Sequence, residues 1–187
     1  MFCVEGQWHK NLTDRSSVLP MLDLLNRLGH CSFIHKDVAT PEELHYFLTR
    51  WTEQRYAAYR VGYFAMHGEA KHLYVADRQP AVSLDEIAGT LDGRCEGKRL
   101  YFASCSVLRA PDAVLEDFLH ATGAALVCGY TRQVDWVESA ALELALLRYL
   151  TNGERVDAVE RAMRSRRWSP LADHLGFRIM YANGRSA

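Results

Sequence analysis

Short apolar runs alternate with segments of helical spacing from one end of the chain to the other. The runs expected to form sheet strands are residues 2–5, 32–34, 61–66, 99–104, 125–128 and 177–181. The segments expected to form helices are residues 19–28, 40–51, 83–91, 112–121, 135–152 and 154 to about 166. Such alternation is typical of a mostly parallel sheet with helices on both faces. The pattern therefore predicts an α/β fold, a three-layer α/β/α sandwich around a six-stranded sheet.

Several predicted helices carry start signals. Residues 40–43 combine a threonine N-cap, a proline and a glutamate three residues after the cap. Ser83 and Glu86 form a second capping box, and Asp135 is the expected N-cap of the longest helix. The apolar spacing predicts that the buried face of that longest helix consists of Val137, Ala140, Ala141, Leu144 and Leu147.

Composition narrows the class of protein. The chain has 187 residues, of which 49% are hydrophobic and 24% charged, as expected for a single domain that spans residues 1–187 around a sizeable core. The formal net charge is only -1, so we expect neither nucleic acid nor a membrane surface as a partner. The first residues lack the pattern of a signal peptide, and no stretch of about 18 apolar residues occurs. A cytoplasmic location is the resulting expectation.

Cysteine and histidine spacing argues against metal. The five cysteines include no C-x-x-C pair, and the eight histidines include no H-E-x-x-H motif. Neither phosphate-binding motif, G-x-x-x-x-G-K-[ST] or G-x-G-x-x-G, occurs, which disfavours a nucleotide-binding domain. We therefore expect no metal and no organic cofactor. Cys3 and Cys128 lie in apolar strands and are expected to be core residues.

Two reactive side chains follow successive predicted strands. His67-Gly68 follows the run 61–66, with residues 73–75 as the return arm of a hairpin, and Cys105 follows the run 99–104. Catalytic groups in open α/β sheets gather beyond the carboxyl ends of strands, and neighbouring strands lie only about 5 Å apart. We therefore expect His67 to serve as the base for a Cys105 nucleophile. The backbone N–H groups of Gly68 and Cys105 are expected to stabilise the oxyanion.

The segments YFAMHG and RLYFASCS, in this order and followed by VCGY, resemble the caspase-like peptidase clan of caspases, metacaspases, separases and CHAT domains. The resemblance extends over residues 2–182 and is greatest to a compact stand-alone CHAT domain, because no processing linker is recognisable. It implies a caspase-like fold with His67 and Cys105 as the dyad of a thiol protease. One departure is Ala103, since metacaspases tend to have an aspartate two residues before the nucleophile.

The same resemblance implies a substrate pocket built from the end of the first strand and the loop after the fifth. Glu5, Arg132 and Asp135 stand at these places. Two carboxylates could bind an arginine or lysine before the scissile bond. Asp135 could instead serve only as a helix cap. Arg132 could pair with Glu5 or accept an acidic substrate residue.

Two functions from different classes stay open at this point. A cysteine endopeptidase would cleave a protein or peptide substrate through a thioester acyl-enzyme, in a regulated signalling or defence role. A catalytically inactive caspase-like scaffold, or a regulatory binding domain, would keep the fold without the chemistry. Because no accessory domain is recognisable, a separate regulatory protein is the expected control of an active enzyme.

Overall fold

A central sheet organises the computed structural model, which describes residues 1–153 and 155–182. The sheet is six-stranded, in the order β2-β1-β3-β7-β8-β9. Its strands are β1 (Phe2–Glu5), β2 (Ile34–Asp37), β3 (Val61–Ala65), β7 (Arg99–Phe102), β8 (Leu126–Tyr130) and β9 (Phe177–Tyr181). All neighbouring pairs are parallel except β8 with β9. The predicted mostly parallel α/β sheet is therefore confirmed.

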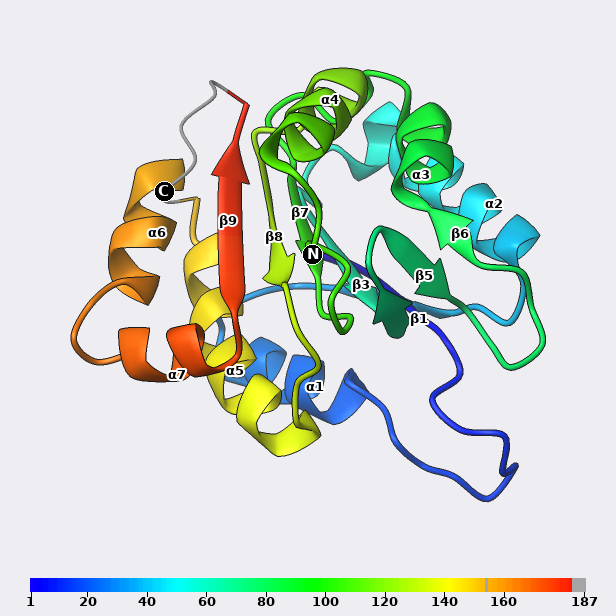
Figure 1. Cartoon of the computed structure of the whole chain (residues 1–187), viewed down its shortest axis with the longest axis horizontal. Helices are drawn as coiled ribbons and strands as arrows, with labels where there is room; N and C mark the ends of the chain where they lie inside the picture. The colour runs from blue at the N-terminus through cyan, green and yellow to red at the C-terminus, as the bar shows by residue number, and fades with distance from the viewer. Residues whose placement is uncertain (154, 183–187) are drawn as a thin grey trace.

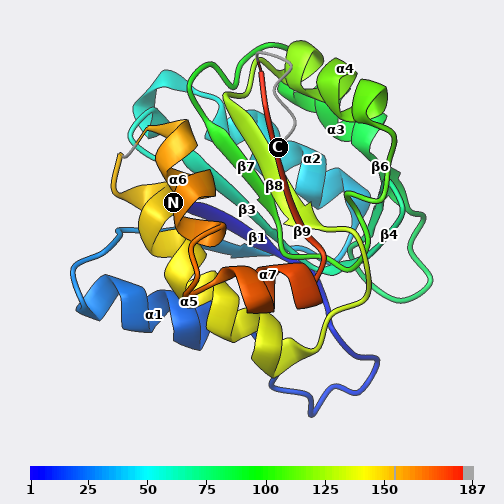
Figure 2. The same ribbon diagram turned by 60° about the vertical axis from the view of Figure 1, so that its left-hand side comes forward.

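Helices cover both faces of this sheet (Figures 1 and 2). One layer contains α2 (Pro41–Trp51), α3 (Leu84–Leu91) and α4 (Asp112–Thr122), with the short 3-10 helix η1 (Gln54–Tyr56) after α2. The other contains α1 (Leu19–Arg27), α5 (Trp136–Thr151), α6 (Val156–Met163) and α7 (Ser169–His174). Adjacent residues of a strand point to opposite faces of the sheet. Phe64 therefore packs in the core under α2, α3 and α4, and Tyr63 packs in the core under α1, α5, α6 and α7. The strand β3 is thus packed from both faces of the sheet.

A small antiparallel sheet follows β3. It consists of β4 (His67–Glu69), β5 (His72–Tyr74) and β6 (Val82–Ser83), in the order β4-β5-β6. The predicted hairpin return after the histidine is confirmed by the antiparallel pairing of β4 with β5. His67 is the first residue of β4, so it lies where the chain leaves the central sheet.

Some elements differ from the sequence-based expectation. β2 begins at Ile34 instead of residue 32 and continues to Asp37, because this edge strand is largely polar and has no apolar run to mark it. The six-residue helix α7, which begins with Ser169-Pro170, was not predicted, because it is too short to show a helical period. The helix expected from 154 to about 166 is shorter and ends at Met163; residue 154 lies outside the described residues.

The buried face of α5 also differs from the prediction. The residues of α5 that are buried are Ser139, Leu142, Glu143, Leu146, Leu147 and Leu150. Only Leu147 belongs to the predicted face, and Val137, which was expected to be buried, is 74% exposed. The helix is therefore rotated relative to the predicted face, and the rotation brings Glu143 inside. No helix in the described part of the chain has both the length and the apolar character needed to cross a membrane.

Candidate active site

The two residues of the predicted dyad follow two strands that pair side by side. β3 and β7 pair in parallel with Phe64 opposite Phe102. His67 follows β3 and Cys105 follows β7, each three residues beyond this last paired position. The ladder continues past the strand ends, since the Ala103 N–H donates to the Phe64 carbonyl at 2.9 Å. The two residues therefore follow the carboxyl ends of neighbouring strands, as expected from the sequence.

Gly68 brings the histidine strand against the cysteine loop. A β-carbon on Gly68 would lie 2.7 Å from Cβ of Ser104 and 2.8 Å from the Cys105 carbonyl oxygen, and it would overlap Cγ2 of Val107. Any side chain at this position would push β4 away from the cysteine loop. Glycine after the histidine therefore permits the close approach on which a Cys-His pair depends.

The backbone around Cys105 is held in an unusual conformation. Ser106 has a φ of 56°, in the left-handed region that side-chain-bearing residues rarely adopt. Its N–H donates to the Arg132 carbonyl at 3.0 Å, which anchors the turn to the loop after β8. Ser104 is buried and its hydroxyl donates to the Phe64 carbonyl at 3.4 Å. The Cys105 N–H donates to none of the described residues.

A backbone carbonyl orients the imidazole. Nε2 of His67 lies 2.6 Å from the Trp8 carbonyl oxygen, which can only accept, so Nε2–H is the donor. Nδ1 of the neutral ring is then the nitrogen that can take a proton. The Trp8 ring also packs edge-on against His67, with 5.4 Å between ring centroids. Its indole N–H in turn donates to Glu5 at 2.6 Å. Glu5 thereby fixes the tryptophan that orients the histidine.

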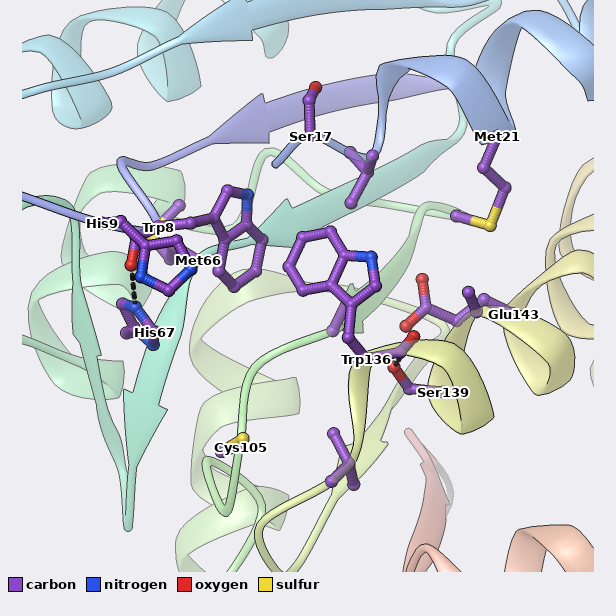
Figure 3. Close-up of a pocket in the computed structure, with 14 residues that line it drawn as sticks. Trp8, His9, Ser17, Met21, Met66, His67, Cys105, Trp136, Ser139 and Glu143 are labelled. Atoms are coloured by element: carbon purple, nitrogen blue, oxygen red, sulfur yellow. Dashed lines mark hydrogen bonds between the residues drawn. The ribbon is translucent and has the colours of Figure 1, made fainter. Parts of the chain in front are cut away.

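His67 and Cys105 line the same cavity, of about 290 Å³. Its wall is mostly apolar and comes from the loop after β1, from α1, from the cysteine loop and from α5. The lining residues are Trp8, His9, Ser17, Val18, Met21, Met66, His67, Ala103, Cys105, Val134, Trp136, Ser139, Ala140 and Glu143. Figure 3 shows Trp8 and Trp136 between His67 and Glu143, with Cys105 below them. The two indole rings meet edge to face at 4.5 Å.

Glu143 is the acidic residue of this cavity. It is only 4% exposed, and its carboxylate accepts hydrogen bonds from the hydroxyls of Tyr63 and Tyr130. Burial raises the pKa of Glu143 to about 7, although the hydrogen bonds from Tyr63, Tyr101 and Tyr130 act in the opposite direction. A carboxyl group that is about half ionised near pH 7 therefore lines the same cavity as His67 and Cys105.

The three residues expected to bind substrate occupy other places. Glu5 is 2% exposed and lines a neighbouring cavity. Its four hydrogen-bond partners are the Trp8 indole, the Ser17 hydroxyl, the Val18 N–H and the His35 imidazole. Asp135 accepts from the N–H groups of Val137 and Glu138, which is the cap geometry considered above. The Arg132 guanidinium donates to the His174 carbonyl at 3.3 Å.

The candidate metal ligands of the described residues form one group. Glu5, His35 and Asp37 bring their ligand atoms within 4.8 Å of one another. His35 lies 2.6 Å from the Glu5 carboxylate, which already accepts hydrogen bonds from three other donors. The hydrogen-bond network around Glu5 accounts for this group without a metal ion.

Sequence reasoning missed Trp8, Trp136 and Glu143. Trp8 follows a strand end and Trp136 follows a helix cap, positions at which aromatic residues commonly belong to a core or a surface. Glu143 was hidden because α5 is apolar around much of its circumference. A usable signal was present, since Ser139, Glu143, Leu146 and Leu150 recur at helical spacing, and a glutamate on such a stripe has to be buried.

Comparison with solved structures agrees with the fold described above. Caspase-1 from Spodoptera frugiperda is similar with a TM-score of 0.53 and 14% identity, over 84% of this chain and 73% of that chain. The fold is thus caspase-like, and identity at this level shows the fold alone. Residues 1–181 match DUF6642, a family of unknown function, and the chain belongs to that family. No curated protein matches the chain.

Proposed function

We propose that this protein is a cysteine endopeptidase that cleaves a protein or peptide substrate with Cys105 and His67. The observation that carries the proposal is that His67 and Cys105 line one cavity beyond the carboxyl ends of the neighbouring strands β3 and β7. The hydrogen bond from His67 to the Trp8 carbonyl adds support, because it leaves Nδ1 as proton acceptor. The caspase-like fold agrees with this chemistry but does not carry it.

The proposed reaction has two stages. The thiol proton of Cys105 passes to Nδ1 of His67, and the thiolate attacks the substrate carbonyl carbon. The N–H groups of Gly68 and Cys105 stabilise the oxyanion. When the carbon–nitrogen bond breaks, His67 returns the proton to the leaving amine, and a thioester remains. Water then attacks the thioester, gives its proton to His67, and releases the acid product as the thiol is restored.

Cleavage should depend on both residues and folding on neither. We would incubate the protein with a peptide library, with mass spectrometry as the readout, and compare it with the Cys105→Ala, His67→Ala and double variants. Loss of the nucleophile is expected to lower turnover on the order of a millionfold, and the double variant should resemble either single one. Thermal unfolding should show a stability change of about 1 kcal/mol or less, since both side chains lie at the cavity.

The matched control is Cys31→Ala, because Cys31 is the other cysteine that is not fully buried. This variant should cleave like the parent protein. Full cleavage by Cys105→Ala would contradict the proposal. If the parent protein itself cleaved nothing in the library, the caspase-like domain would be assigned to the scaffold class.

A further inference from the structure

The cavity beside the dyad contains a buried acid that the proposed reaction does not use. Glu143 projects from α5, and Figure 3 shows its carboxylate on the far side of Trp136 from His67. Cys105 lines the same cavity. A substrate held for attack by Cys105 could therefore extend a side chain toward Glu143.

The partners of Glu143 leave it without positive charge. The Tyr63 hydroxyl donates to one carboxylate oxygen, and the Tyr130 hydroxyl lies 3.5 Å from the other. No cationic group of the described residues contributes to the pKa of Glu143. A buried carboxylate that no cation pairs is costly, and a carboxylate can accept about four hydrogen bonds. The Glu143 carboxylate can therefore accept further hydrogen bonds, and a cationic donor would stabilise its negative charge.

The walls of the cavity fit the stem of a long cationic side chain. Apolar groups of Val18, Met21 and Met66 surround the space, together with the rings of Trp8 and Trp136. Methylene groups pack well on such walls, and indole faces attract guanidinium and ammonium groups. A short acidic side chain would instead meet the carboxylate of Glu143 with the same charge.

We propose that Glu143 is the residue that selects the substrate, by binding the cationic end of an arginine or lysine placed before the scissile bond. This inference rests on the proposed peptidase function for its cleavage step, whereas the binding step requires only the cavity. It transfers the basic preference, expected above from Glu5 and Asp135, to a residue that lines the same cavity as Cys105 and His67.

Binding should then strengthen with pH. The titratable groups of the sheet near Glu143 are Tyr63, Tyr101 and Tyr130, which act on its pKa, and Cys3, whose own pKa Glu143 raises. Burial raises the pKa of each well above its ordinary value, so all four stay neutral near pH 7. Across the cavity stand His9, His67 and Cys105. Since the pKa of Glu143 is about 7, its ionised fraction rises about tenfold between pH 6 and 8.

The decisive experiment measures binding without cleavage. The Cys105→Ala protein is titrated by calorimetry with acetyl-Gly-Gly-Arg amide and with the matched norleucine peptide. We expect the arginine peptide to bind at least about tenfold more tightly, and Glu143→Gln to weaken it by about 100-fold, as when one member of a buried charge pair is removed. Affinity for the arginine peptide should increase about tenfold from pH 6 to 8 and become nearly constant with pH in Glu143→Gln.

Glu138→Gln is the matched control, because Glu138 is on the same helix but pairs with His174 at the surface. It should leave both affinities unchanged. Equal affinity for the two peptides, or no effect of Glu143→Gln, would overturn the inference. In parallel, the protein with Cys105 intact is assayed on peptides with arginine, leucine or aspartate before the cut. If the arginine peptide bound through Glu143 but no peptide were cleaved, only the peptidase proposal would be wrong. If cleavage did not change in Glu143→Gln, only this inference would be wrong.

Discussion

At the scale of single residues, two buried glutamates show how burial and hydrogen bonding compete. Burial alone would raise the pKa of Glu5, but hydrogen bonds from His35, Trp8 and further donors outweigh it and lower that pKa. For Glu143 the effect of burial exceeds that of the hydrogen bonds, and the pKa rises to about 7. Glu5 is thus a stable anion that holds the loop after β1, whereas Glu143 gains from a cation. We assign a structural role to Glu5 and propose a recognition role for Glu143.

The raised pKa of Glu143 has a consequence for stability. Its ordinary value is 4.5, so between pH 4.5 and 7 the folded state holds a proton that the unfolded state has lost. Stability should therefore fall as pH rises through this window, by up to about 3 kcal/mol, and level off above it. Glu143→Gln should lack this contribution. Urea unfolding of both proteins at pH 4.5, 6 and 8 gives the free energy of unfolding as a function of pH. If this free energy changed with pH in the same way in both proteins, the raised pKa of Glu143 would be contradicted.

At the scale of elements, the sequence predicted where strands end better than which way helices face. The parallel pairing of β3 with β7 could be anticipated, because one apolar run ends before His67 and the next ends before Cys105. The orientation of α5 could not, because alanine and leucine occupy most sides of that helix. Because the place of Glu143 depends on that orientation, the sequence does not reveal it, whereas the position of Glu5 in the chain favours Glu5.

The packing of β4 against the cysteine loop gives a prediction for Gly68→Ala. The added methyl group would lie 2.7 Å from Cβ of Ser104, which overpacks the contact and is expected to cost about 1–3 kcal/mol. It should also displace His67 from Cys105 and lower cleavage more than stability alone explains. Gly89→Ala in α3 is the control, since no atom of the described residues that its new methyl group could meet lies within 4 Å. That control should stabilise the protein by about 0.5–1 kcal/mol in thermal unfolding.

At the scale of the whole molecule, the layers separate one cysteine from the other four. Cys3, Cys95 and Cys128 are buried between sheet and helices, and Cys31 packs beside the core under α1, α5, α6 and α7. Cys105 alone lines the cavity beyond the strand ends. Three of the thiols are therefore small core groups and Cys31 is partly buried, whereas Cys105 lines the same cavity as His67.

This separation predicts the order of alkylation in the native protein. Burial raises the pKa of the Cys3, Cys95 and Cys128 thiols, that of Cys95 to about 12, and it also raises the pKa of Cys31. Thiolate is the reactive form, so these four should react slowly with iodoacetamide at neutral pH, and Cys105 should react first. His67→Ala should slow Cys105 and leave Cys31 unchanged, and in guanidinium all five should react at similar rates. Peptide mapping by mass spectrometry over a time course follows each site separately. If Cys31 were alkylated before Cys105, or if His67→Ala left the Cys105 rate unchanged, the imidazole would not activate the thiol and the scaffold reading would replace the peptidase.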